Sequence, residues 1–551
     1  MPLPNKTIKV LYKLSYFFWY LFIFTIPFGT RLIIKSRLVD GVFVEWGTIS
    51  IFASETVLLF LCFFVSLLII FDWGTVKNRI LEYKKVIIAL AVFLALALIS
   101  AINSQFFAAS SWQFLRVIEV SLLLVSVIIL RPSFKNTALV FSLSLIPSLI
   151  LGIFQFGFQF SPASKWLGIA QHLPEVLGTS VVGTFVDPAV GGVNRFLRVY
   201  GTFAHPNIFA AYLTVNFWVL IYLILKFSTC SNSNDDILRP TPISPGESRS
   251  SLLRWRSART ILAEWTKKSG RGILSPVLYF LFFLNFYCLF LTFSRAAWMA
   301  LLVSLLVCWF ISLLVKPRET PLRPSPFKKG GGLGWGILVL FLLLFIFASV
   351  LVCAHHDLVF SRFGKDSYLE VKSISERVAG LGEAKEIIFK SPRSSPFEKG
   401  GLRGILFGVG PGAYTYALAQ KFFELSPYQL QPVHNVWLLI LSELGIFGFL
   451  AFIIFLIQII RNINFQNKIP HLPRLLSGSA SGGNPPPLEK GEEGRGIFIS
   501  PFTKGGIRGI LIIVLLVLSL FDHYLWSLWP GLALAGLILS FGFLSHEIPH
   551  E

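Results

Sequence analysis

Long apolar runs recur along the whole chain and decide what it can fold into. The hydrocarbon core of a bilayer needs roughly 20 apolar residues per helix. Runs of about that length lie near 14–30, 51–71, 86–102, 113–130, 137–158, 205–227, 273–293, 296–315, 336–354, 434–460, 509–521 and 526–545. Only 14% of the residues are charged, against about a quarter in soluble domains. We therefore predict an all-α, polytopic transmembrane helix bundle of about 12 spans.

The distribution of basic residues predicts how this bundle is oriented. Lys6, Lys9 and Lys13 precede the first run and no small-residue cleavage site follows it, so we expect a retained anchor rather than a signal peptide. With the N-terminus inside, the cytoplasmic segments hold about 30 of the 48 Lys and Arg residues. The net charge of +20 then reflects orientation, and we expect no nucleic-acid partner. Both termini become cytoplasmic, and 159–204 and 354–433 become two large external loops.

Neither the cysteines nor the acidic residues indicate a metal site. The chain has five cysteines, four of them within or beside apolar runs, and none has CxxC spacing. The predicted external loops contain no Asp-x-Asp motif and no cluster of carboxylates. We expect no metal and no cofactor.

Repeated Pro-, Gly- and Lys-rich segments interrupt the chain and divide it into parts. Three copies of Ser-Pro-Phe-x-Lys-Gly-Gly begin at Ser325, Ser395 and Ser500. Their composition favours inserted flexible linkers, although the cytoplasmic copies could also contact lipid. We predict N-terminal spans with the first large external loop (1–194), a core (195–460), a flexible cytoplasmic insert (461–508), C-terminal spans (509–551), and linkers near 228–272, 316–335 and 393–404.

Three polar motifs stand where predicted spans begin or end. They are Arg198-Val-Tyr-Gly-Thr-Phe-Ala-His-Pro-Asn207, Phe293-Ser-Arg-Ala-Ala-Trp298, and His434-Asn-Val-Trp-Leu followed by Ser442-Glu-Leu-Gly445. The predicted topology opens all three onto the same side of one bilayer. We therefore treat them as one candidate active site.

Arg198 and Arg295 are candidate ligands for an anion. Arg198 precedes His205-Pro-Asn207, a sequence suited to the start of a helix. Arg295 lies in a hairpin of a few residues between two predicted spans. A single arginine near a helix end can simply extend its side chain to water. Two arginines on one face favour a phosphate-binding site, because guanidinium groups bind phosphate oxygens bidentately.

His434 is the strongest candidate for catalysis. It lies at the mouth of the tenth predicted span, where an imidazole can take a proton from an acceptor hydroxyl. An interfacial histidine that only makes hydrogen bonds is the alternative. Glu443 would lie roughly 13 Å deeper along a straight helix. A carboxylate at that depth should face the protein interior or a polar cavity, and a structural hydrogen-bonding role suits it better than chemistry.

Three further segments can contribute to the site. The turn Gly408-Val-Gly410-Pro-Gly412-Ala-Tyr414 lacks the Lys and Ser/Thr of a phosphate loop and favours a tight turn. Glu376-Arg377 begins a predicted amphipathic external helix with Val378, Leu381, Ala384 and Ile388 at helical spacing. Arg377 either joins the phosphate site or is solvated. Asp522-His523-Tyr524 with Trp526 either lines the same cavity or belongs to an interfacial aromatic belt.

Together these motifs resemble the O-antigen ligase and O-antigen polymerase family. The matching region covers roughly 195–460 in the family's motif order, including Thr292-Phe-Ser-Arg295 and Ser391-Pro before the glycine turn. The resemblance implies a GT-C-like membrane glycosyltransferase that needs no metal. It implies transfer of a glycan from a polyprenyl-diphosphate carrier to a lipid or glycan acceptor, on the external or periplasmic face of the plasma (inner) membrane.

The resemblance also implies a role for each site residue. Arg198, Arg295 and Arg377 would hold the donor diphosphate, and His434 would activate or orient the acceptor hydroxyl. The supporting residues would be His205, Asn207, Gly410, Gly412, Tyr414, Asn435 and Glu443. One departure is the inserted repeat near 393–404, which leaves open how Arg377 sits against the glycine turn.

Other functions share many of these features. A polymerase uses the same donor but adds the glycan to another lipid-linked glycan. A transporter or flippase of lipid-linked sugars would show repeat symmetry or paired helix breaks, which the sequence does not indicate. A scaffold subunit would need no His434 chemistry. We favour a ligase-like transferase, because the motif order is shared and no extra soluble domain marks a protein-glycosylating member.

Overall fold

The computed structural model describes residues 4–176, 178–184, 194–232, 276–314, 332–362, 368–389, 401–466 and 506–545. The predicted linkers 228–272, 316–335 and 393–404 and the insert 461–508 lie mostly outside these residues, as do the three repeat copies. Where their edges are described they are helical, since helices include Asn232, Gly332 and Gly401. The described part of the chain is mostly helical, with 73% of its residues in helices.

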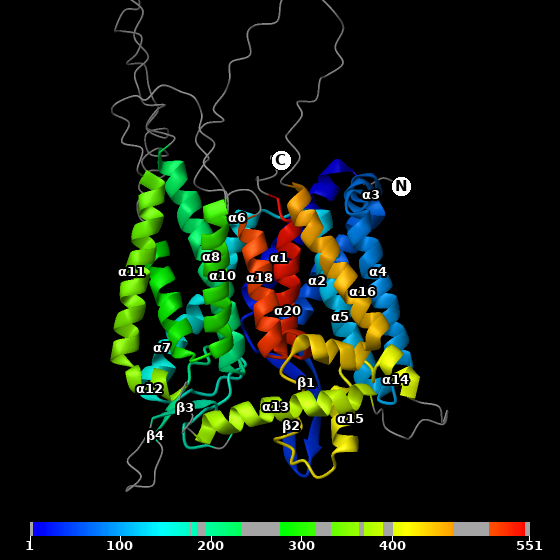
Figure 1. The fold of residues 1–551 in the computed structure, drawn as a ribbon. Coiled ribbons are helices and arrows are strands. Elements are labelled where there is room, and N and C mark those ends of the chain that lie inside the picture. The colour runs from blue at the N-terminus through cyan, green and yellow to red at the C-terminus, as the bar shows by residue number, and fades with distance from the viewer. Residues whose placement is uncertain are drawn as a thin grey trace, which may run out of the picture.

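The helices form a bundle with roughly aligned axes (Figure 1). Seven helical segments in the described part of the chain are long and apolar enough to cross a membrane. They are α1 (Asn5–Thr25), α2 (Ala53–Phe71), α4 (Lys84–Ile102), α5 (Phe107–Leu130), α6 with α7 (Phe134–Ser144 and Ile146–Phe158), α8 (Pro206–Asn232) and α16 (Val436–Gln466).

Shorter apolar helices complete the bundle. They are Pro276–Leu291, α10 (Arg295–Leu314), α11 (Gly332–Ala354), α18 (Gly506–Phe521), and α20 (Trp529–Ser540) with the 3-10 turn η1 (Phe541–Phe543). Two further short helices are α3 (Trp73–Glu82) and α19 (Tyr524–Ser527). Every apolar run predicted from the sequence therefore coincides with a helix.

Burial separates central helices from peripheral ones. In the most apolar part of α8, 89% of the residues are buried, against 28% in α1 and 33% in α2. Large apolar side chains are exposed on the outer helices, including Phe60 and Phe63 on α2 and Ile88 on α4. Helices that present apolar side chains outward along their length need an apolar solvent, so this pattern fits a multi-pass membrane protein.

The strands and the helices between residues 356 and 421 gather at the lower end of the bundle in Figure 1. The antiparallel hairpin β1 (Arg31–Val39) and β2 (Val42–Phe52) was not predicted. Its two-residue turn has positive φ at both Asp40 (50°) and Gly41 (77°), as a type I′ hairpin turn requires. The predicted loop 159–204 contains β3 (Val181–Thr184) and β4 (Asn194–Leu197). The predicted loop 354–433 contains α12 (His356–Ser361), α13 (Tyr368–Phe389), α14 (Gly401–Phe407) and α15 (Tyr414–Lys421).

The helix predicted to begin at Glu376 is present as part of α13, which lies across this end of the bundle (Figure 1). Its buried side differs from the predicted one. Ala384 is buried as expected, but Val378 and Leu381 are exposed, and Ile387 is more deeply buried than Ile388. The helix carries apolar residues on more than one side, so its packing against α14, α15 and α16 decides which are covered.

A bend in α16 joins two of the sequence motifs. Gly445 has φ 66° and ψ −174°, which interrupts the helix. Figure 1 shows a first segment across the lower end of the bundle and a second segment rising beside α4. The bend leaves the carbonyls of Ser442 and Glu443 free of helical partners. They accept hydrogen bonds from the backbone N–H groups of Val409 (3.0 Å) and Gly410 (2.8 Å), respectively. The glycine turn is thus hydrogen-bonded into a backbone junction.

We expect Gly445→Ala to destabilise the protein by about 2 kcal/mol or more, because this backbone conformation is nearly restricted to glycine. A Cβ atom would also collide with the backbone of Leu406. Thermal unfolding in detergent micelles measures the effect. Gly380→Ala on α13 is the control, since no atom lies within 4 Å of its added Cβ. Equal melting temperatures for the two variants would contradict the proposed importance of the junction.

Candidate active site

Arg198 connects the first motif to the second. It follows β4 and is 5% exposed. Its Nε donates to the Thr292 carbonyl (2.7 Å), its Nη1 to the Ser180 hydroxyl (2.7 Å) and its Nη2 to the Asn207 side-chain oxygen (2.8 Å). A guanidinium held in three directions is a fixed positive charge, because any movement breaks charge-assisted hydrogen bonds.

Asn207 extends this network to Asp522, between α18 and α19. Its Nδ2 donates to Asp522 Oδ2 (2.8 Å), and its backbone N–H donates to His205 Nδ1 (3.1 Å). Asp522 Oδ1 accepts the backbone N–H of His523 (2.8 Å) and lies 3.6 Å from His434 Nδ1. The buried Asp522 carboxylate is therefore where the first and third motifs meet.

The histidines around Asp522 set the charges of the cluster. Burial alone would raise the pKa of Asp522, but His434, His523 and His205 hold that pKa well below its usual range. The distance of 3.6 Å between His434 Nδ1 and Asp522 Oδ1 is longer than a hydrogen bond. Burial lowers the pKa of His523 to about 4, and burial with the Arg198 charge lowers the pKa of His205 to about 3. At neutral pH the cluster combines a carboxylate with neutral imidazoles at His205 and His523.

Arginines surround the turn of the second motif. Phe293 has a left-handed φ of 47°, which is rare for an aromatic residue and reverses the chain before α10. Arg362 donates through Nη2 and Nε to the Phe293 carbonyl (2.9 and 3.2 Å), and Arg295 Nη1 donates to the Arg362 carbonyl (3.4 Å). Arg198 binds the adjacent Thr292 carbonyl. Three guanidinium groups near one turn make this region favourable for an anion.

Arg377 lies apart from that turn in the sequence and is half-buried on α13. This helix packs against α14, α15 and α16, on the side of the glycine turn. The segment 390–400, which contains most of the inserted repeat, lies outside the described residues. The structure thus places the helix of Arg377 beside the glycine turn.

Glu443 holds the glycine turn against α19. Its Oε2 accepts from Trp526 Nε1 (2.7 Å) and its Oε1 from the backbone N–H of Tyr414 (3.4 Å). Figure 1 shows the first segment of α16 across the end of the bundle, so the nine residues from His434 to Glu443 do not lead straight into it. The predicted 13 Å of depth does not apply. Gly412 and Tyr414 are part of the glycine turn that Glu443 holds in this way.

Asn435 fixes the position of His434 at the start of α16. Its Oδ1 accepts the backbone N–H of Leu438 (3.0 Å), which makes it the N-cap of the helix. Its Nδ2 donates to the Leu520 carbonyl at the end of α18 (3.1 Å). The cap therefore ties the residue after His434 to the helix that leads into Asp522.

A polar cavity of about 1080 Å³ opens beside these residues. Gly412, Glu443, His523 and Trp526 contribute to its lining. The β1–β2 hairpin forms another wall with Arg37, which lies over the rings of Trp46 (4.6 Å) and Tyr416 (4.2 Å). Arg116 on α5 also lines the cavity and pairs with Glu55 at 3.1 Å.

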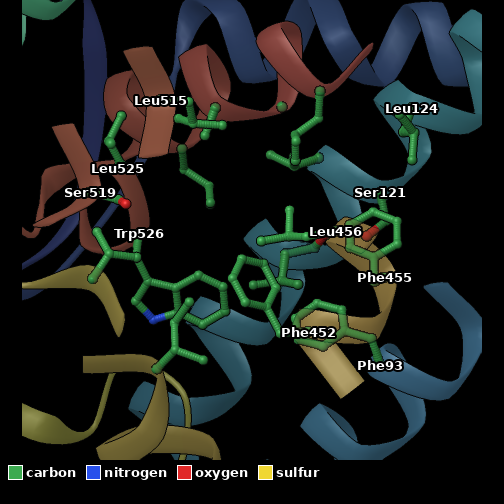
Figure 2. A pocket seen from close by; sticks show the side chains of 18 of the residues that line it. Phe93, Ser121, Leu124, Phe452, Phe455, Leu456, Leu515, Ser519, Leu525 and Trp526 are labelled. Carbon is green, nitrogen blue, oxygen red and sulfur yellow. Dashed lines mark hydrogen bonds between the residues drawn. The ribbon is translucent and has the colours of Figure 1, made fainter. Parts of the chain in front are cut away.

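An apolar pocket adjoins this cavity at Trp526, which lines both. Figure 2 shows the pocket enclosed by side chains of α4, α5, α16 and α18, with Phe93, Phe452 and Phe455 on one side and Trp526 on another. Its volume is about 100 Å³. A charged surface and an apolar one thus meet at a single side chain.

Some of these residues were not identified from the sequence. Arg362, Arg37 and the Arg116–Glu55 pair have no place among the predicted site residues. The Asp40-Gly41 turn between two β-branched runs was a usable signal for the hairpin. Ionisable residues within apolar runs, such as Arg116, are a further functional signal.

Comparison with known proteins adds no relative: no protein-family model matches the chain, and no curated protein matches it.

The lowered pKa values of His523 and His205 predict that the folded protein is less stable in acid. An unfolded histidine titrates near 6.5, while His523 and His205 titrate near 4 and 3 in the folded protein. Between these values the unfolded state binds more protons, so the free energy of unfolding falls as the pH drops below about 6.5. Melting temperatures between about pH 7.5 and about pH 5 measure this. His523→Gln should flatten the dependence and exposed His356→Gln should not; equal slopes in all three proteins would refute it.

Proposed function

We propose that the protein is a membrane glycosyltransferase of the O-antigen ligase type, with twelve spans and both termini in the cytoplasm. It transfers a glycan from a polyprenyl diphosphate to an acceptor hydroxyl at the outer face of the plasma membrane. The observation that carries the proposal is the approach of His434 Nδ1 to the buried Asp522 carboxylate, at 3.6 Å. An imidazole oriented by a carboxylate is the usual arrangement of a general base.

The proposed reaction assigns one proton transfer to His434. Its Nδ1–H faces Asp522, so its Nε2 carries the lone pair that accepts the proton of the acceptor hydroxyl. The acceptor oxygen attacks the anomeric carbon of the donor sugar as the bond from that carbon to the phosphate oxygen breaks. The polyprenyl diphosphate leaves with the bonding electrons, and the negative charge of Asp522 stabilises the imidazolium that forms.

The arginines around Thr292–Arg295 are the proposed site of the diphosphate. Arg198 is fixed by three hydrogen bonds, so it supplies a charge in a constant position. Arg362 donates to the Phe293 carbonyl of the same turn, and Arg295 donates to the Arg362 carbonyl. Fixed positive charges stabilise the negative charge that builds up on a departing diphosphate. Arg377 would approach from α13.

The two adjoining cavities suit an amphiphilic substrate. The larger cavity offers polar groups for a sugar, and the pocket shown in Figure 2 is lined mostly by apolar side chains that suit a hydrocarbon chain. A polyprenyl-linked glycan carries both chemical parts. A polymerase would use the same donor, and its acceptor would be a second lipid-linked glycan.

His434→Ala should lower the rate of glycan transfer by about 10²-fold or more, because a positioned general base contributes roughly that much. Asp522→Asn should lower kcat with a smaller effect on KM, since it acts through His434. Both are measured with the purified protein, a polyprenyl-diphosphate glycan and candidate acceptors, with product analysis to separate ligation from polymerisation.

His356→Ala is the matched control for these variants, because His356 is exposed on α12 with its own neighbour, Asp357. Its transfer rate should equal that of the unaltered protein. Undiminished transfer by a folded His434→Ala protein would eliminate the catalytic role assigned to this residue.

Arg295→Ala should weaken donor binding about 10-fold to 100-fold, the effect of losing one charge-assisted hydrogen bond. Arg131→Ala removes an equal charge from a partly exposed pair with Glu82, at the junction of α5 and α6, and should leave affinity unchanged. Binding of a fluorescent polyprenyl diphosphate in nanodiscs measures both. Equal affinities would place the diphosphate elsewhere.

A further inference from the structure

The cluster of His434, Asp522 and His523 has the geometry of a metal site. Each residue offers one ligand atom, and the three atoms lie within 4.8 Å of one another. Ligand atoms bound to one tetrahedral Zn²⁺ at about 2.0–2.1 Å are roughly 3.4 Å apart. The His434 Nδ1 to Asp522 Oδ1 distance, 3.6 Å, is close to that value. Small side-chain rotations would bring all three atoms onto one ion.

His434 Nδ1 provides a second, independent observation. This nitrogen is buried and makes no hydrogen bond within the described residues. A buried polar atom without a partner costs about 1–3 kcal/mol. A bound ion between the histidine and the carboxylate would give that nitrogen a partner.

The surrounding residues hold the other two ligands in place. His523 Nδ1 is 2.6 Å from the Ser527 hydroxyl, which leaves its Nε2 for an ion. Asp522 Oδ2 accepts from Asn207, which is itself fixed by Arg198. Protein metal sites orient their histidine and carboxylate ligands by such outer hydrogen bonds.

The ligand set indicates which ion would bind. Two imidazoles and one carboxylate are the ligands of many zinc sites that keep a fourth position open, whereas Mg²⁺ and Ca²⁺ prefer oxygen ligands. His523 lines the polar cavity, which gives an ion a path from solvent. We propose that these three residues form a Zn²⁺ site, and that Zn²⁺ bound there inhibits the protein.

The inhibition follows from the proton on His434, and this part rests on the proposed transferase function. A neutral imidazole carries one N–H. When Nδ1 binds Zn²⁺, the single ring proton moves from Nδ1 to Nε2 by exchange through solvent, so the ring stays neutral. Nε2 then cannot accept the proton of an acceptor hydroxyl. Zn²⁺ and general-base catalysis are therefore mutually exclusive at His434.

Binding is tested on the full-length protein, purified in detergent without a histidine tag, stripped with a chelator and titrated calorimetrically with Zn²⁺. We expect one ion per chain, and visible absorption typical of tetrahedral coordination when Co²⁺ replaces it. His523→Ala should abolish this binding, and Asn207→Ala should weaken it about 10-fold to 100-fold.

Two controls make this result decisive. His356→Ala removes an exposed histidine that lies 3.0 Å from Asp357 and could hold an ion by itself; it should leave the affinity unchanged. Thermal unfolding without metal checks that His523→Ala is folded. Absence of stoichiometric binding, or binding lost with His356 and kept without His523, would overturn the proposal.

Inhibition is measured separately, so the two proposals can fail independently. Zn²⁺ at saturation should reduce glycan transfer by the unaltered protein at least about tenfold. The residual transfer of His523→Ala, measured against the metal-free rate of the same variant, should resist Zn²⁺. Zn²⁺ binding without transfer activity in any preparation would refute the transferase function and leave the metal site standing. Equal inhibition of both proteins would refute inhibition through this site.

Discussion

The buried carboxylate of Asp522 is the interaction on which the arrangement of the site depends. It receives a hydrogen bond from Asn207 at the start of α8 and one from the backbone of His523, and it attracts His434 at the start of α16. A buried carboxylate is costly unless donors or positive charges surround it. The three segments must therefore converge for this charge to be tolerated.

The hydrogen bonds of Arg198 connect the segments around Asp522 to the rest of the site. Arg198 joins Asn207 to the carbonyl of Thr292, so the segment before α8 is tied to the turn before α10. Arg362 also holds this turn, through the Phe293 carbonyl. Positive groups that bind the protein's own carbonyls are already oriented when a ligand arrives, which reduces the cost of binding. The structural role of Arg198 and its proposed role toward a diphosphate are thus compatible.

The bend at Gly445 in α16 holds the glycine turn, which contributes Gly412 to the lining of the polar cavity. It exposes two carbonyls of α16 that bind the glycine turn, and Glu443 fixes the same turn through Tyr414 and Trp526. The polar cavity and the apolar pocket meet at that tryptophan. One rigid junction therefore positions the cavity, while His434 and Asp522 lie next to it.

The mostly helical fold, with helices long and apolar enough to cross a membrane, followed from the sequence alone, because a run of about 20 apolar residues is a local property that needs no partner to be recognised. The polar motifs and His434 could also be found locally, since polar residues stand out in an apolar chain. The Asp40-Gly41 hairpin was predictable from its turn and was overlooked. Only the tertiary structure decided that His434 faces Asp522, a residue 88 positions later. Contacts between distant segments depend on how the helices pack, and neither spacing nor composition records that packing.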